Sequence, residues 1–164
     1  MTDTSTTPAR RVELSHQVAS MLAEETPEAR LGRSFVRFAE ALLDPDSRRI
    51  DEVISIDARF HELEAAGLPP GPEGFKLFRQ QINTAFPDEH TVIVAMRFPE
   101  ENYIETELDC TATHRGELMG IPATGRSVRF TVHTRNRFEH GRMAERWDRM
   151  DFAGLMAQIS GPLD

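Results

Sequence analysis

The sequence predicts an α+β fold in which helices cover one face of a curved antiparallel sheet. Apolar residues recur every three or four positions through much of the first 86 residues, as in helices that bury one face. After residue 91 they alternate one by one, as in strands with one buried face. Helices followed by a run of strands favour an α+β arrangement over an α/β one. Such a sheet, closed on one side by helices, would form a cone with an internal pocket.

Two helices and a short helical turn are predicted before residue 60. They follow a polar, threonine-rich segment over residues 1–10 that we expect to be disordered. The first helix has four residues on its apolar face: Leu14, Val18, Met21 and Leu22. The second is expected to begin at Pro27, with Thr26 as its N-cap, and to end at 44–46. A single helical turn is expected at 49–54.

The second half of the chain changes from helical to strand periodicity. A brief strand is expected at 60–63, before a stiff loop rich in proline and glycine. The next helix has a phenylalanine-rich face formed by Phe75, Phe78, Ile82 and Phe86. Four strands are then predicted, over residues 92–98, 103–114, 128–138 and 142–149, and a final short helix begins at residue 151.

Length and composition indicate one globular domain, expected over residues 11–164. The net charge of −8 and the absence of a basic face argue against a nucleic-acid partner. No apolar run reaches the roughly 18 residues of a membrane span, and the N-terminus lacks the apolar core of a secretory signal. The single cysteine, Cys110, excludes an internal disulfide and a cysteine-based metal site. We therefore expect a cytoplasmic protein with no membrane partner.

Four segments, in this order and spacing, resemble the SnoaL-like polyketide cyclases, also called ester cyclases, of the nuclear-transport-factor-two-like superfamily. The segments are GLPPGPEGFKLF at 67–78, TATHRGELMGIPATG at 111–125, RFEHGRMAERWD at 137–148 and DFAGLMAQIS at 151–160. The resemblance implies a cone-shaped α+β barrel that forms homodimers or higher homo-oligomers and binds a small hydrophobic molecule. The family's cyclases close a ring by an intramolecular aldol step, which requires neither a metal nor an organic cofactor.

The resemblance places the catalytic acid and base on Asp148. A carboxyl group in an apolar pocket has a raised pKa, so it can both take and return a proton near neutral pH. The alternative is a solvated charge at the end of a strand, paired with Arg146 or Arg149. Simple alternation puts Met143, Glu145 and Trp147 on the other face of this strand, and Glu145 becomes the candidate if the pocket lies there. A bulge near 146–148 would also change the answer.

The family's second polar group is a histidine on the preceding strand, and this sequence departs from that pattern. Thr134 occupies the matching position, with His133 next to it. Either His133 enters the pocket through a one-residue slip, or the group is missing and His133 belongs to a solvated stripe.

Further candidates for binding a substrate come from the resemblance and from side-chain type. His61 would face the cavity or lie on the surface beside Glu62, and His114 would line the mouth or hold the loop by hydrogen bonds. The apolar loop containing Leu118, Met119 and Ile121 would cover the pocket or form a dimer contact. Two aromatic residues would suit a flat polycyclic ligand if they are not simply core: Phe78 and Trp147. No histidine or acid spacing indicates a metal site.

Three functions remain open from the sequence. The first is a cyclase or related lyase or isomerase that acts on a small hydrophobic carbonyl compound or a polyketide-like substrate. The second is a non-catalytic module of the same fold that binds a hydrophobic small molecule or dimerises. The third is epoxide hydrolysis, with Asp148, Arg137 and Glu145 around one water.

Overall fold

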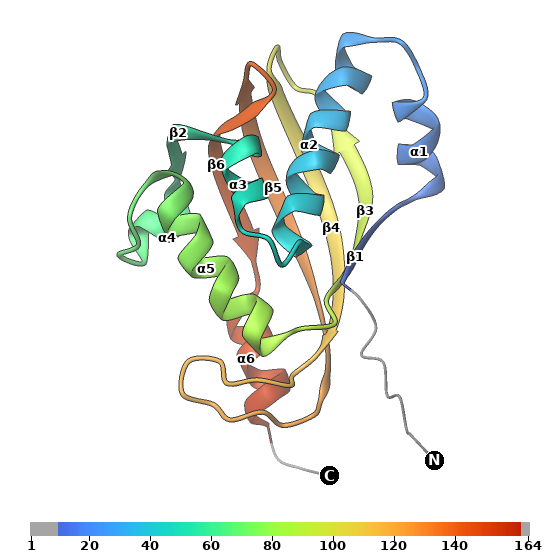
Figure 1. Ribbon diagram of the computed structural model, residues 1–164. Helices are drawn as coiled ribbons and strands as arrows, with labels where there is room; N and C mark the ends of the chain where they lie inside the picture. The colour runs from blue at the N-terminus through green and yellow to red at the C-terminus, as the bar shows by residue number, and fades with distance from the viewer. Residues whose placement is uncertain (1–9, 162–164) are drawn as a thin grey trace, which may run out of the picture.

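One six-stranded sheet organises residues 10–161, which are the residues that the computed structural model describes. The strand order is β1-β3-β4-β5-β6-β2 (Figure 1). The strands are β1 (Arg11–Leu14), β2 (Ile54–Phe60), β3 (His90–Arg97), β4 (Tyr103–Thr113), β5 (Ser127–Glu139) and β6 (Arg142–Met150). The helices are α1 (His16–Leu22), α2 (Pro27–Leu43), α3 (Arg48–Val53), α4 (His61–Ala65), α5 (Gly71–Ala85) and α6 (Phe152–Ser160).

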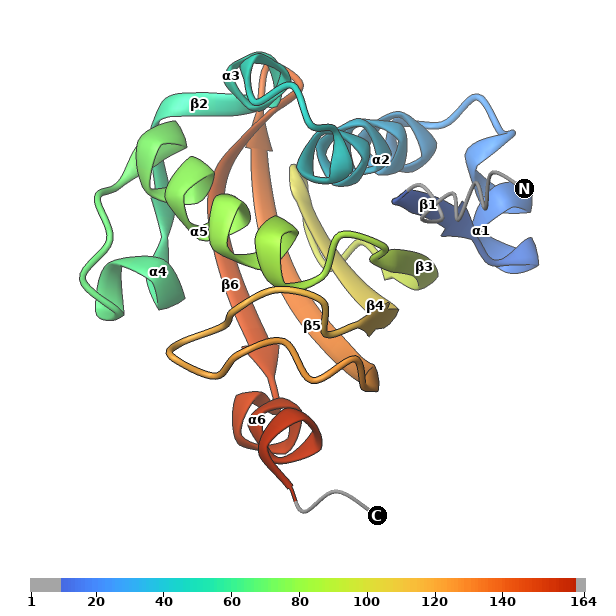
Figure 2. The ribbon, with the colours of Figure 1, turned by 60° about the horizontal axis from the view of Figure 1, so that its bottom comes forward.

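The predicted α+β class is confirmed, and helices α2 and α5 lie across the concave face of the curved sheet (Figure 2). The sheet differs from the prediction in two respects. It is mixed, because β1 pairs with β3 and β2 pairs with β6 in parallel, while the four central strands are antiparallel. The ordered sheet is also open, since β1 and β2 are its two edges. Both edge strands come from the helical half of the chain, and such distant segments can join a sheet in parallel through long crossovers.

Helix α2 is the element that the sequence predicts best. Thr26 is its N-cap, with Oγ1 accepting a hydrogen bond from the Ala29 amide at 3.0 Å, and Pro27 occupies the first turn. The helix buries Phe35 and Phe38 completely against the sheet. The short helix predicted at 49–54 is also present, as α3.

Two local predictions are wrong. Leu14 belongs to β1, which pairs with β3 from Arg11↔His90 to Leu14↔Ile93, and Ser15 then caps α1. Four residues that alternate in polarity fit a strand as well as the first turn of a helix, so only the pairing with β3 separates the two. The strand expected at 60–63 ends at Phe60, because the chain turns into α4 at His61.

Two apolar clusters fill the space on the concave side. The larger one lies under α2 and α5 and includes Phe35, Phe38, Phe60 and Phe75. The smaller one lies at the opposite end of the sheet, where Phe86 and Leu118 meet Leu155 and Ile159 of α6. The loop between β4 and β5 and helix α6 close this end (Figure 2).

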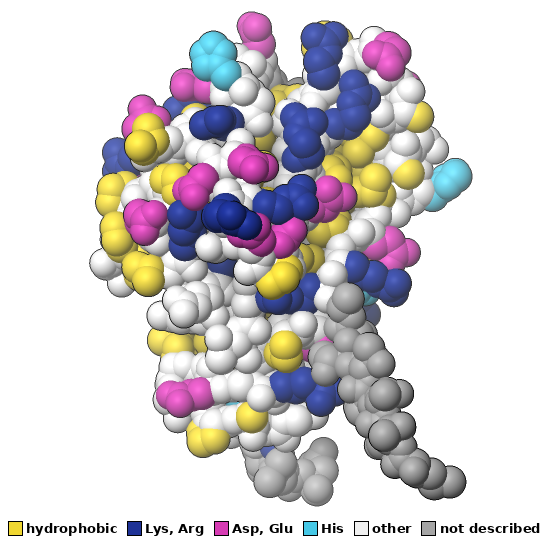
Figure 3. All heavy atoms as spheres, in the orientation of Figure 1, with side chains coloured by type: hydrophobic (Ala, Val, Ile, Leu, Met, Phe, Trp, Pro, Cys, Tyr) yellow, Lys and Arg dark blue, Asp and Glu magenta, His cyan; other side chains and the backbone are white. Residues whose placement is uncertain are grey.

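Charges are mixed on the helical side of the molecule. Acidic and basic side chains are interspersed where α3 meets α5 (Figure 3), including the pairs Lys76–Asp51 at 2.8 Å and Arg49–Asp44 at 3.1 Å. Among residues 10–161, no helix combines the length and the apolar character needed to cross a bilayer. The segment predicted to be disordered, 1–10, lies outside the described residues except for Arg10.

Candidate active site

Five polar side chains cross the concave face of the sheet beneath the helices, and we call them the polar ladder. Strand register places them side by side: Thr106 of β4 pairs with Thr134 of β5, which pairs with Asp148 of β6. Asn136 pairs with Arg146 one step further along. All except Asp148 are buried. Because buried polar groups require partners, this row must be internally satisfied or must face a ligand.

The ladder is joined by short hydrogen bonds. The Thr106 and Thr134 hydroxyls lie 2.6 Å apart, and Asn136 Nδ2 donates to Thr134 Oγ1 at 2.7 Å. Arg146 Nη1 donates to Asn136 Oδ1 at 3.2 Å, and its guanidinium lies 5.1 Å from the centre of the Phe38 ring. These contacts fix the guanidinium next to Asp148, with Arg146 Nε 2.6 Å from Asp148 Oδ1.

Asp148 is the one member of the ladder that combines a buried oxygen with access to solvent. Its Oδ1 is buried and receives no well-aligned hydrogen bond, since the nearby Arg146 N–H does not point at it. The side chain nevertheless keeps 26% of its surface exposed. Burial raises the pKa of the carboxyl group above its usual range, the Arg146 charge opposes that rise, and the Glu62 charge adds to it. A carboxyl group with a raised pKa takes and returns a proton at higher pH than a solvated aspartate does.

Strand β6 decides which acid faces the interior. Asp148 lies on the concave face with Arg146, so the alternative candidate, Glu145, lies on the outer face. The register shifts between Arg137↔Glu145 and Phe138↔Met143, which leaves Ala144 as the extra residue of a bulge. Simple alternation is therefore wrong for Met143, which is buried. The predicted pairing of Asp148 with Arg146 is present, but the pair is largely buried rather than solvated.

The outer face carries four residues that were candidates for the pocket. His61 binds Glu145, with His61 Nε2 2.8 Å from Glu145 Oε2, and stacks on Trp147 at 4.8 Å. His133 is exposed on β5, opposite Glu107 of β4 and Arg149 of β6.

None of these four side chains shares a site with Asp148, because successive residues of a strand point to opposite faces. The arrangement required for epoxide hydrolysis is also not formed, since Arg137 and Glu145 pair at 3.5 Å on the outer face. Thr134 is in the ladder, and Phe78 of α5 packs against the main core.

His114 and Met119 lie at the other end of the sheet. His114 follows Thr106 by eight positions, which spans about 26 Å in an extended strand. The ring is fully buried, and its Nδ1 lies 2.9 Å from Thr124 Oγ1 and accepts a hydrogen bond from the Thr124 amide. His114 therefore holds the loop, as one of the two sequence interpretations expects.

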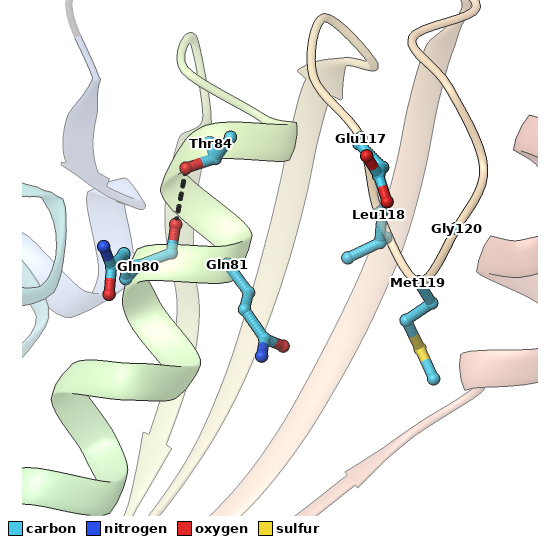
Figure 4. A pocket seen from close by; sticks show the side chains of 7 residues that line it. All are labelled: Gln80, Gln81, Thr84, Glu117, Leu118, Met119 and Gly120. Carbon is cyan, nitrogen blue, oxygen red and sulfur yellow. Dashed lines mark hydrogen bonds between the residues drawn. The ribbon is translucent and has the colours of Figure 1, made fainter.

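The loop from His114 to Gly125 has a tight two-residue turn at its tip. Leu118 and Ile121 exchange both backbone hydrogen bonds, and Met119 and Gly120 between them have φ values of 49° and 83°. Leu118 is buried and points toward α5, whereas Met119 points away and is 68% exposed (Figure 4). The apolar loop thus covers the smaller cluster and not Asp148.

We expect Gly116→Ala to destabilise the protein by about 2 kcal/mol or more. A Cβ at Gly116 would overlap the backbone carbonyl of Thr84, which lies at the end of α5 where the loop is attached. Gly120→Asn is the matched control. A Cβ at Gly120 meets open space, and asparagine tolerates the positive φ of this position. Urea unfolding of both variants measures the difference, and equal losses would contradict this account of the loop.

Asp148 lines neither of two open hollows on the surface formed by residues 10–161. One of about 660 Å³ lies between Gln80, Gln81 and Thr84 of α5 and the tip of the loop (Figure 4). The other, of about 520 Å³, lies where β5 and β6 meet α6, and His133 and Arg149 are among its lining residues. The polar ladder therefore reaches solvent through the exposed part of Asp148 and not through either hollow.

Comparison with known proteins places the chain in a family. The model of the SnoaL-like polyketide cyclase family matches residues 33–159. The chain belongs to the SnoaL-like polyketide cyclase family. Among curated proteins, none matches this sequence.

Solved structures agree with the SnoaL-like fold. A candidate SnoaL-like polyketide cyclase from Jannaschia sp. CCS1 is 18% identical with a TM-score of 0.71, covering 85% of this chain and 98% of that chain. IdmH, a candidate polyketide cyclase from Streptomyces antibioticus, is 27% identical with a TM-score of 0.66, covering 78% and 96%. AclR, a candidate hydroxylase from Streptomyces galilaeus, is 22% identical with a TM-score of 0.67, covering 84% and 85%. One fold thus carries more than one assigned chemistry.

Three ladder residues of this SnoaL-like chain were not among the candidates from sequence: Thr106, Asn136 and Arg146. A signal for two of them was available, because Thr106 shares a strand face with the apolar Ile104 and Leu108, and Asn136 shares one with Val132 and Phe138. Polar residues on an otherwise apolar strand face indicate a buried network or a binding site. Arg146 gives no such signal, since an arginine in a strand is usually exposed to solvent.

Proposed function

We propose that the protein catalyses cofactor-independent acid/base chemistry of the aldol type on a small hydrophobic carbonyl or polyketide-like compound. Asp148 is the catalytic acid and base in this proposal. The observation that carries it is the environment of Asp148: a buried oxygen, a raised pKa, an adjacent guanidinium and a side chain that keeps 26% of its surface exposed. Membership of the SnoaL-like polyketide cyclase family supports the same reaction class.

The mechanism follows from the two opposing influences on Asp148. Burial makes the carboxylate a stronger base than a solvated aspartate, while the cation of Arg146, 2.6 Å away, opposes this rise of the pKa and favours the ionised form. The carboxylate takes a proton from the carbon next to a carbonyl, and the resulting carbanion attacks a second carbonyl of the same molecule. The new carboxylic acid then returns its proton to the alkoxide that forms, so Asp148 ends in its starting state.

Hydrogen–deuterium exchange tests this proposal without the natural substrate. In D2O, the protein should accelerate deuterium uptake next to the carbonyl of at least one member of a panel of aryl ketones and keto esters, as followed by proton NMR. Asp57→Asn, which removes an exposed carboxylate of β2, should exchange as fast as the wild type. If no compound of the panel takes up deuterium faster with the protein than in buffer, the proposal is contradicted. That result would favour the non-catalytic binding or dimerisation module.

Two further expectations belong with this proposal. A homodimer or higher homo-oligomer and a cytoplasmic location stay predictions from the family resemblance and the composition. Neither is needed for the proton transfer, because every residue of the ladder comes from one chain.

A further inference from the structure

Asn136 is the member of the polar ladder that joins three strands. Its Nδ2 donates to the Ile104 carbonyl oxygen of β4 at 3.1 Å and to Thr134 Oγ1 of β5 at 2.7 Å. Its Oδ1 accepts a hydrogen bond from Arg146 Nη1 of β6 at 3.2 Å. The side chain has no exposed surface, so its hydrogen-bonding groups depend on partners that the protein itself supplies.

The amide group of Asn136 fits its surroundings in one orientation. The Ile104 carbonyl oxygen accepts hydrogen bonds and has no proton to donate, so the NH2 group of the amide must face it. The amide oxygen then faces Arg146, whose guanidinium has only donors. A flipped amide would place oxygen against oxygen and N–H against N–H, and buried polar groups are costly to leave unpaired. The backbone of β4 therefore requires that an acceptor points at Arg146.

The guanidinium of Arg146 is held by groups other than Asp148. Asn136 lies directly opposite Arg146 in the pairing of β5 with β6 and accepts from Nη1. The ring of Phe38 from α2 lies 5.1 Å from the guanidinium carbon. With these two contacts in place, Arg146 Nε lies 2.6 Å from Asp148 Oδ1. Because Arg146 is buried, its neighbours decide where its charge lies.

We propose that Asn136 is the positioning residue of this site, because its amide oxygen holds the Arg146 guanidinium against the carboxyl group of Asp148. Asn136 forms no hydrogen bond with Asp148 within residues 10–161, and it does not touch the substrate in this scheme. It acts through Arg146, since a cation favours the ionised form of a carboxyl group most strongly at close range. The inference rests on the proposed function for its catalytic meaning, but its test needs no substrate.

The pKa of Asp148 responds to two charged groups of the described chain. Arg146 of β6 favours the ionised form, and Glu62 of α4 disfavours it. Thr134 of β5 is opposite Asp148 and uncharged. Replacing Asn136 by an uncharged residue removes neither charge. A change in the titration of Asp148 in such a variant therefore reports a change in the position of the Arg146 guanidinium.

The test is a direct titration of the Asp148 carboxyl carbon by NMR. Asn136→Leu keeps the branched shape of the side chain but removes the acceptor for Arg146, so it should raise the pKa of Asp148 by about half a unit to one unit. In an Arg146→Met background, the same change should shift the pKa by less than about 0.2 unit, because the group through which Asn136 acts is then missing.

Thr106→Val is the matched control within the ladder. It also removes a buried hydrogen-bonding group, the hydroxyl that lies 2.6 Å from Thr134 Oγ1, but this hydroxyl forms no hydrogen bond with Asn136 or Arg146 in the described chain. The pKa of Asp148 in Thr106→Val should stay within about 0.2 unit of the wild-type value.

A measurement on the wild type decides the inference if Asn136→Leu does not fold. Nitrogen-15 NMR separates the two Nη groups of an arginine when rotation of its guanidinium is slow, and it averages them when rotation is fast. Arg146 should give separate signals. Arg149, which is exposed and makes no hydrogen bond or ion pair within residues 10–161, should give one averaged signal. An averaged signal for Arg146 would overturn the proposal.

The outcomes separate this inference from the proposed function. An unchanged pKa in Asn136→Leu would show that Asn136 does not position Arg146. An equal shift in the Arg146→Met background would show that Asn136 acts without Arg146, and an equal shift in Thr106→Val would indicate a general loosening of the ladder. Each of these results would overturn the inference even if no ketone exchanges. If exchange is observed, the pH of half-maximal rate should rise in Asn136→Leu by the same shift as the pKa.

Discussion

We expect Asp148→Asn to slow proton abstraction from the carbon next to a carbonyl by about 10²- to 10⁴-fold, the usual contribution of a positioned acid or base. Asparagine keeps the shape of the side chain and leaves an oxygen next to the Arg146 guanidinium, but it cannot take a proton. The deuterium exchange assay measures the effect. Because Glu145 lies on the outer face of the sheet, it cannot replace the lost base.

The same variant should fold at least as stably as the wild type at pH 7. The pKa of Asp148 is raised in the native state, so the native protein holds this proton to a higher pH than the unfolded chain does. The stability of the wild type therefore falls as pH rises from the usual aspartate value, about 3.9, through the native value. Asparagine has no such loss, and the difference should vanish near pH 3.

Thermal melting as a function of pH checks this second result. A variant that loses both activity and stability at pH 7 would indicate that Asp148 is a structural partner of Arg146. A variant that keeps full exchange activity would show that another group is the base. Loss of activity with retained or increased stability is the result that a functional carboxyl group predicts.

We expect Arg146→Met to destabilise the protein by about 2–3 kcal/mol at pH 7. Methionine preserves much of the packing on Phe38, but the Asn136 Oδ1 atom loses its donor and Asp148 loses the only cation beside it in the described chain. The pKa of Asp148 should then rise further. We expect a loss of stability at the low end of the range for a broken buried ion pair, because Asp148 is partly exposed to solvent.

The loss in Arg146→Met should depend on pH in a defined direction. Near pH 3 Asp148 is protonated in both the folded and unfolded states, so only the lost hydrogen bond to Asn136 and the lost contact with Phe38 remain. Arg149→Met is the matched control, since Arg149 is exposed and makes no hydrogen bond or ion pair within residues 10–161; its effect should stay within about 0.5 kcal/mol.

Urea unfolding at the two pH values gives both results. The double variant Arg146→Met with Asp148→Asn should lose less stability than the sum of the single changes, because no charge is then left without its partner. Strict additivity, or a loss that is the same at pH 3 and pH 7, would contradict a functional link between the two side chains.

Much of the local structure follows from the sequence because its causes are local. The N-cap of α2 depends on Thr26 and Pro27, which are next to each other in the chain. The four segments that indicate the family also depend on neighbouring residues. Asp148 was found in this way, through the match around Arg137 and Gly141, although no local pattern could show that its carboxyl group is buried.

The remaining features were decided by contacts between distant segments. Pairing with β3 makes a strand of Arg11–Leu14, and the bulge at Ala144 turns Met143 inward. His61, Glu145 and Trp147 meet on the outer face only because β2 lies beside β6.

The sequence by itself determined the class of fold, the family and the central antiparallel strands, and it predicted Asp148 as the candidate acid. Only the tertiary structure decided which face each candidate occupies and that Arg146 and Asn136 lie in one row with Asp148. The physical reason is that alternation along a strand is preserved only up to a bulge, and the field at a carboxyl group is set by charges from other elements.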